Sequence, residues 1–123
     1  MSRENNIQQG TILVVDDDRI NISLIKAILE DYNVLSACDA GDFFAIIEKE
    51  IPDIILLDIM MPGIDGMTIA RRLKSDQRYR EIPIVFLSAV TSAESVAGGF
   101  TLGAHDYIRK PFDGAELQAR VKR

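Results

Sequence analysis

The sequence is poor in three residue types: it contains one cysteine, one histidine and no tryptophan. Cys38 cannot form an internal disulfide, so we expect it to be a small packed residue. No apolar stretch approaches the roughly 20 residues that a membrane-spanning helix requires. Residues 1–10 are polar and lack the apolar centre of a secretory signal, which predicts a flexible tail on a cytoplasmic protein.

Basic residues are also few relative to acidic ones. There are 14 Lys and Arg against 19 Asp and Glu, which gives a net charge of −5. This excess of negative charge argues against direct binding of a nucleic-acid backbone by this domain. With 123 residues, the chain is long enough for one domain, which we place at residues 11–123.

Short apolar runs alternate with amphipathic segments along the whole chain. Several of these runs are nearly continuous in Val, Ile and Leu, which favours strands that are covered on both faces. The predicted strands span residues 12–15, 33–37, 54–57, 82–87 and 106–108. The alternation predicts an α/β fold with one parallel five-stranded sheet and helices on both faces.

Acidic residues mark the expected starts of several helices. Asp18, Asp39, Asp65 and Asp113 each precede an amphipathic segment and are suitable N-cap residues, and Thr91 has the capping-box spacing with Glu94. In the helix after Asp18, spacing of three and four residues predicts one apolar face. The members of that face are Ile20, Leu24, Ile25, Ile28 and Leu29.

Polar side chains follow four of the predicted strands, at the point where each strand ends. Asp16 and Asp17 follow the first strand, and Asp58, Ser88 and Lys110 follow the third, fourth and fifth. The carboxyl ends of parallel strands meet at one edge of the sheet, where ligands bind. If the first and third strands are neighbours, their carboxylates lie close together, and close carboxylates repel one another or take up a proton unless a cation is present. A hard divalent ion such as Mg²⁺, bound by carboxylates and water, would remove this repulsion.

The same residues favour phosphate chemistry. A carboxylate such as Asp58, beside a metal and an ammonium group, can attack phosphorus and form an acyl phosphate. Lys110 would neutralise charge on the phosphoryl oxygens, and the hydroxyl of Ser88 would donate a hydrogen bond to one of them. Each residue has an ordinary explanation by itself, as a solvated or capping side chain. Their combination at one edge of the sheet favours a site.

Four stretches, "ILVVDDD", "IILLDIMMPGIDG", "IVFLSA" and "YIRKPF", resemble in their order and spacing the response-regulator receiver domain of two-component signalling. The resemblance extends from Thr11 nearly to the end of the chain. It implies a single (βα)5 flavodoxin-like three-layer sandwich with strand order 2-1-3-4-5, an order for which the flavodoxin-like folds are the standard example. It also implies a phosphorylation-dependent signalling switch that assists its own phosphorylation and slow dephosphorylation but is not otherwise an enzyme.

The resemblance implies which residues receive the phosphoryl group and bind the metal. Asp58 matches the phosphoacceptor. Asp16 and Asp17 match the acidic pair that binds Mg²⁺, for which Mn²⁺ can substitute. Asp58 and the backbone carbonyl of Met60 complete the implied metal ligands.

Three further residues match the switch machinery of the family. Ser88 matches the hydroxyl residue, Lys110 the lysine and Tyr107 the aromatic residue that turns inward on phosphorylation. These changes would alter the face formed by the fourth helix, the fifth strand and the fifth helix. Gly98 and Gly99 would weaken that fourth helix by roughly 1 kcal/mol each relative to Ala.

The implied partners are a histidine kinase or phosphotransfer protein, a C-terminal output domain or downstream protein, and a second copy of the chain in a homodimer. His105, the sole histidine, lies in the loop before the fifth strand, and we expect it to be solvated. The chain therefore has no candidate kinase histidine. We expect it to be a piece of a longer protein.

Two rival functions remain at this stage. The first is a metal-dependent aspartyl-phosphate phosphohydrolase, which normally needs a second acid/base Asp near the nucleophile and a cap over its substrate; position 60 is Met instead. The second is a receiver-like interaction module that is never phosphorylated. In the family, side chains at the positions of Met60 and Val90 flank the hydrolytic water, and neither can orient water here. We therefore expect slow self-dephosphorylation.

Overall fold

The computed structural model describes residues 10–59, 66–88, 106–109 and 113–122. Strands and helices alternate along these segments, as the apolar runs predict. The elements are β1 (Thr11–Val15), α2 (Arg19–Ile28), β2 (Asn33–Ala37), α3 (Ala40–Lys49), β3 (Ile54–Asp58), α4 (Gly66–Lys74), β4 (Ile84–Ser88), β5 (Asp106–Arg109) and α6 (Gly114–Lys122).

The strands form one sheet in the order β2-β1-β3-β4-β5. All four strand pairs are parallel. The inner strand β1 pairs with β2 on one side and β3 on the other, so that Val15 lies opposite both Ala37 and Leu57. The predicted fold class and strand order are confirmed.

Successive residues of the central strands contribute to two separate cores, one on each face of the sheet. Leu13 and Val15 of β1 belong to the first core, whereas Ile12 and Val14 belong to the second. Neighbouring side chains of a strand point to opposite faces, so strands covered on both faces must be apolar at every position. This explains why the strand segments of the sequence are continuous apolar runs.

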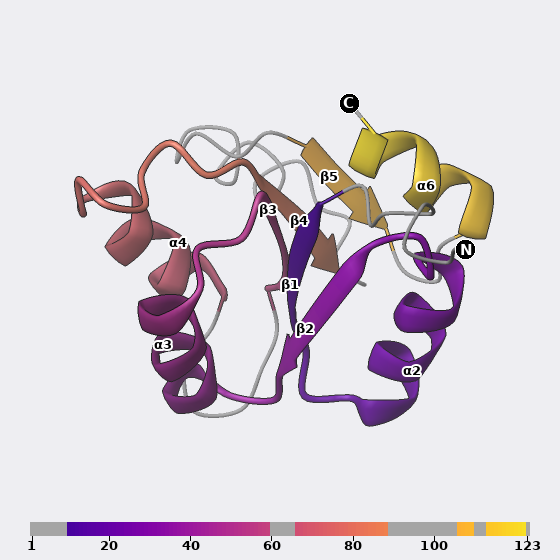
Figure 1. Cartoon of the computed structure of the whole chain (residues 1–123), viewed down its shortest axis with the longest axis horizontal. Coiled ribbons are helices and arrows are strands. Elements are labelled where there is room, and N and C mark those ends of the chain that lie inside the picture. The colour runs from indigo at the N-terminus through magenta and orange to yellow at the C-terminus, as the bar shows by residue number, and fades with distance from the viewer. Residues whose placement is uncertain (1–9, 60–65, 89–105, 110–112, 123) are drawn as a thin grey trace, which may run out of the picture.

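Within the described part of the chain, helices α3 and α4 cover one face of the sheet and helices α2 and α6 cover the other (Figure 1). Helices α3 and α4 contribute Phe43, Ile69 and Leu73 to the first core. Helices α2 and α6 contribute Ile25 and Leu117 to the second. The protein is therefore a three-layer sandwich, and no helix within the described ranges is both long enough and apolar enough to span a bilayer.

Acidic side chains cap three of the helices. The Oδ1 atom of Asp18 accepts a hydrogen bond from the backbone N–H of Ile20 at 2.9 Å, and Asp39 accepts one from Asp42 at 2.8 Å. Asp113 accepts one from Ala115 at 3.0 Å. Each bond satisfies a backbone donor that has no partner within its helix.

The expected apolar face of α2 is partly wrong. Ile20 is 79% exposed and Leu24 is 47% exposed, whereas Ile22, which the spacing did not select, is buried. Ile25 and Leu29 are buried as expected. Within a short helix rich in Ile and Leu, two neighbouring stripes both satisfy the three-and-four spacing, and only the packing against the sheet selects one of them.

The fourth strand begins two residues later than expected, at Ile84. Ile82 belongs to the preceding turn, where its backbone N–H bonds to the carbonyl of Tyr79. Pro83, between them, has no N–H to donate to a neighbouring strand, which explains the late start.

Candidate functional site: an acidic cluster at the carboxyl edge of the sheet

Three carboxylates from two neighbouring strands meet at the carboxyl edge of the sheet. Asp16 and Asp17 directly follow β1, and Asp58 is the last residue of β3. One carboxylate oxygen of each residue lies within 4.8 Å of those of the other two. The sequence prediction that these residues converge is therefore confirmed.

The burial of these carboxylates makes the cluster unusual. Asp16 is fully buried and Asp58 is 3% exposed, whereas Asp17 is exposed. Buried carboxylates are costly unless they are neutralised or receive hydrogen bonds. Hard oxygen ligands at this spacing suit a divalent cation, with the exposed Asp17 on the side open to water. The donor set thus fits a magnesium-type ion.

Local backbone geometry fixes the position of Asp16. Its own N–H continues the sheet by donating to the carbonyl of Ala37 at 3.1 Å. Its Oδ1 atom accepts a hydrogen bond from the backbone N–H of Asp18 at 2.9 Å. Asp18 in turn caps α2, so the turn that begins the helix also orients Asp16.

Asn21, in the first turn of α2, also reaches the cluster. Its Nδ2 atom lies 3.5 Å from the Oδ2 atom of Asp16, and the side chain is half-buried. The sequence analysis did not identify this residue. The available signal was an amide at an inward position of a helix whose other inward residues are apolar.

The backbone after Asp58 is held close to α4 by a glycine. The N–H of Gly66 donates to the carbonyl of Ile59 at 2.8 Å. A Cβ atom on Gly66 would lie 2.2 Å from the carbonyl oxygen of Asp58 and 2.9 Å from the Cα of Ile59. Glycine is therefore required here by close approach to the backbone of the phosphoacceptor candidate, another feature that the sequence analysis did not identify.

The neighbouring strands place the other predicted residues only in part. Asp58 lies opposite Leu87 of β4, so Ser88 is the next residue along the adjacent strand. Tyr107 lies in β5, opposite Phe86. Several residues with predicted roles lie outside the described part of the structure: Met60, Asp65, Val90, Thr91, Gly98, Gly99, His105 and Lys110. The side chains of Ser88 and Tyr107 are not described either. Their predicted roles stay predictions.

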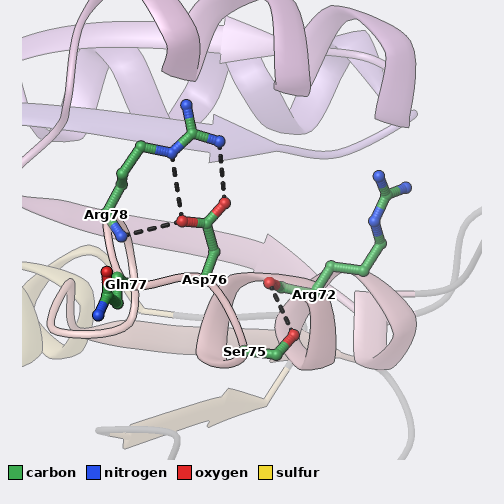
Figure 2. Close-up of a pocket in the computed structure, with 5 residues that line it drawn as sticks. All are labelled: Arg72, Ser75, Asp76, Gln77 and Arg78. Atoms are coloured by element: carbon green, nitrogen blue, oxygen red, sulfur yellow. Dashed lines mark hydrogen bonds and ion pairs between the residues drawn. The ribbon is translucent and has the colours of Figure 1, made fainter.

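Apart from the acidic cluster, the surface has a hollow of about 530 Å³ at the end of α4 (Figure 2). It is lined by Arg72, Ser75, Asp76, Gln77 and Arg78. Two contacts of Arg78 hold Asp76: Nη2 donates to Oδ2 at 2.9 Å and Nε to Oδ1 at 3.2 Å. The guanidinium of Arg72 stacks over the ring of Phe44 at 4.3 Å.

Polar groups in and beside this hollow form hydrogen bonds with one another or with nearby backbone carbonyls. The side-chain hydrogen bond from Arg78, followed by that from its backbone N–H, lowers the pKa of Asp76. The ammonium of Lys74 donates to the backbone carbonyls of Arg80 and Ile82, and its burial lowers the pKa of Lys74. These bonds fix the chain between α4 and β4, so we assign this hollow a structural role.

Comparisons with known proteins agree with the fold and the acidic cluster. A model of the response regulator receiver domain matches residues 12–122. The chain belongs to this family of receiver domains, which are generally phosphoacceptors rather than enzymes and take part in two-component signalling.

Among its curated relatives is the response regulator PleD of Caulobacter vibrioides, 44% identical over 113 residues, which cover 90% of this chain and 25% of PleD. The regulator PhoB of Pseudomonas aeruginosa is 43% identical over 114 residues, which cover 91% of this chain and 50% of PhoB. The chain thus spans a quarter to a half of the length of these relatives.

Solved structures show the same architecture. A protein described as a response regulator from Chloroflexus aurantiacus superposes with a TM-score of 0.87 at 35% identity, covering 92% of this chain and 94% of that one. Chemotaxis protein CheY4 of Vibrio cholerae gives a TM-score of 0.86 at 29% identity, covering 92% and 96%.

Proposed function

We propose that this chain is a phosphorylation-controlled signalling switch that accepts a phosphoryl group on Asp58 from the histidine of a partner kinase or phosphotransfer protein. The observation that carries the proposal is the convergence of Asp16, Asp17 and Asp58 at one edge of the sheet, with Asp58 almost fully buried. Carboxylates this close together suit a divalent cation. Such a cation beside Asp58 would offset the negative charge on the phosphoryl group during transfer.

The transfer is a substitution at phosphorus. An Asp58 carboxylate oxygen forms a bond to phosphorus, the phosphorus–nitrogen bond of the phosphohistidine breaks, and its electron pair returns to the imidazole of the donor. By resemblance, Ser88 would donate a hydrogen bond to a phosphoryl oxygen, and Lys110 would form an ion pair with another. Tyr107 would then turn inward with Ser88.

Asp16, Asp17, Asp58 and the backbone carbonyl of Met60 would hold Mg²⁺, with Mn²⁺ as a substitute. The ion supplies positive charge that offsets the negative charge of the phosphoryl oxygens. Asp17, which is exposed, would bind it directly. Asp16, which is fully buried, would act mostly through water.

The surface beside the acidic cluster supports a protein as the phosphoryl donor. Ile20 is 79% exposed and Leu24 is 47% exposed, one turn apart on α2, and this helix starts directly after the acidic pair. Large exposed apolar side chains beside a reactive group favour docking of a macromolecule. Ile20→Ser should slow transfer from a phosphorylated histidine kinase while leaving labelling by a small phosphodonor unchanged.

The signal would pass through the face formed by the fourth helix, the fifth strand and the fifth helix, to an output domain or a downstream protein. RpaA of Synechocystis, 40% identical over 113 residues, is named as a DNA-binding transcriptional regulator, and this chain covers 47% of it. We propose that this protein acts in the cytoplasm and controls either a C-terminal output domain or a downstream protein. Formation of a homodimer is one way in which phosphorylation would exert this control. The net charge of −5 argues against nucleic-acid binding by this domain itself.

Incubation with acetyl phosphate and Mg²⁺, followed by intact-mass measurement, tests the proposal. We expect stable addition of one phosphoryl group, loss of that addition in Asp58→Asn, and normal addition in Asp31→Asn, an exposed aspartate beyond the end of α2. Turnover of acetyl phosphate without accumulation would instead support the phosphohydrolase. No reaction would support an inert interaction module.

A further inference from the structure

Asn21 is a half-buried amide on the side of α2 that carries the buried residue Ile25. It lies in the first turn of α2, four residues before Ile25, which is fully buried against the sheet. Residues four apart lie on the same face of a helix. Asn21 therefore faces the sheet as Ile25 does, and it is half-buried.

The amide of Asn21 is directed at the most buried carboxylate of the cluster. Its Nδ2 atom lies 3.5 Å from Oδ2 of Asp16, while the other oxygen, Oδ1, accepts the N–H of Asp18 at 2.9 Å. Both oxygens of Asp16 thus face donors from the start of α2. Two donors on different oxygens restrict rotation of a carboxylate more than one donor does.

Rotation of Asp16 matters because its oxygen is one of the three that lie within 4.8 Å of one another. A carboxylate that turned away would leave two acidic groups in the cluster. Groups that orient the ligands of a metal commonly alter its affinity by 10- to 100-fold when they are removed.

We propose that Asn21 is a positioning residue whose amide holds the Asp16 carboxylate in the orientation that completes the acidic cluster, and that it thereby sets the affinity of this cluster for divalent cations. The inference rests on the cation site of the proposed function. The Asn21–Asp16 contact is longer than an ideal charge-assisted hydrogen bond. We therefore expect an effect at the lower end of the range, about tenfold.

The experiment measures Mn²⁺ binding to the full chain, from the electron paramagnetic resonance signal of the free ion. Asn21→Leu is nearly equal in size but has no donor, and Asn21→Ala removes the amide without adding bulk. Both should weaken Mn²⁺ binding about tenfold. Asn21→Gln keeps an amide and should recover part of the affinity.

Asn33 provides a matched control. It is also half-buried, and its Nδ2 atom lies 3.4 Å from Oγ1 of Thr11, at the opposite end of β1 from the cluster. Asn33→Leu makes the same chemical change there, and Mn²⁺ affinity should stay within about twofold of the unmodified chain. Thermal unfolding in the presence of a chelator reports separately on any loss of stability in each variant.

The outcomes distinguish an error in the proposed cation site from an error in the proposed role of Asn21. If the unmodified chain does not bind Mn²⁺, or if Asp17→Asn binds it equally well, the cation site itself is wrong. If the unmodified chain binds Mn²⁺ but Asn21→Ala and Asn21→Leu bind it within about twofold, only the role of Asn21 is wrong. Equal losses in Asn21→Gln and Asn21→Leu would also overturn that role, because they would assign the effect to the helix rather than to the amide.

Discussion

Single residues determine whether the acidic cluster can form. The cluster needs charge at Asp16, Asp17 and Asp58, but it also needs the absence of a side chain at Gly66. The Cβ that any other residue would place there meets backbone atoms of Asp58 and Ile59. Backbone at the end of a buried strand cannot move aside as a flexible side chain can.

Gly66→Ala should therefore destabilise the protein by about 1–3 kcal/mol or more, as overpacking does. Gly41→Ala is the matched control, because a Cβ at Gly41 meets Oδ1 of Asp39 at an ordinary 3.4 Å within α3. That change should be neutral or stabilise by up to about 1 kcal/mol. Urea unfolding of both variants measures the difference, and equal stabilities would contradict the close approach.

Met60 is expected to control how long the phosphoryl group persists on Asp58. Its thioether cannot orient a water molecule by a strong hydrogen bond, so Met60→Asn should shorten the phosphoryl half-life. The half-life is read by intact mass after removal of acetyl phosphate. An unchanged half-life would remove the basis for expecting slow self-dephosphorylation.

At the scale of elements, α2 links the packing of the second core to the geometry of the cluster. One side of the helix carries Ile22, Ile25 and Leu29 into the core. Its first turn supplies donors to Asp16, and its exposed side presents Ile20 and Leu24. The helix thus has a separate structural, positioning and docking side.

Two neighbouring substitutions in α2 should differ sharply in their effect on stability. Ile25 is fully buried, so Ile25→Ala should cost about 2–5 kcal/mol. Leu24 is 47% exposed, so Leu24→Ala should cost less than about 1 kcal/mol. Denaturant unfolding of the two variants tests which side of α2 is buried. Similar losses of stability would contradict the observed side and would support the face that the apolar spacing predicts.

The connection between α4 and β4 should contribute to the pH dependence of the protein's stability. The pKa of Asp76 is lowered by its hydrogen bonds from Arg78, so the charged form is favoured in the folded protein. The stabilisation is present above the carboxyl pKa of the unfolded chain and is lost as the pH falls through the lowered pKa. Asp76→Asn should remove this part of the acid sensitivity, measured as the urea midpoint between neutral and acidic pH.

For the whole molecule, the proposed cation site predicts that cation binding and folding are coupled. The acidic cluster joins β1 to β3 across the centre of the sheet, so it exists only in the folded state. A ligand that binds only the native state stabilises it, by about 1.4 kcal/mol at ten times its dissociation constant. In a domain of this size, this corresponds to a rise in melting temperature of about 5 °C.

Addition of Mg²⁺ at that concentration should therefore raise the melting temperature, and Asp17→Asn should remove the rise. Calorimetry with and without a chelator measures both. The same rise in Asp17→Asn would show that the ion stabilises the chain elsewhere.

Much of this protein followed from its sequence because the determining signals are local. Continuous apolar runs indicate strands covered on both faces, and alternation with amphipathic segments indicates a parallel sheet. The strand order came from the resemblance to the receiver domain, not from the alternation. Parallel strands place their carboxyl ends at one edge, which brings Asp16, Asp17 and Asp58 to the same edge. That they meet also requires the first and third strands to be neighbours, which the resemblance implied. The caps at Asp18, Asp39 and Asp113 are also local and were predicted correctly.

The tertiary structure decided what depends on contacts between distant segments. The buried side of α2 was one such feature, since two apolar stripes fit its sequence equally well and the sheet accepts only one. The start of β4 after Pro83, the contact of Gly66 with the backbone of Asp58 and the approach of Asn21 to Asp16 were others. Residue spacing along the chain carries no information on which of two similar surfaces faces a neighbour, because that choice depends on the shape of the partner surface.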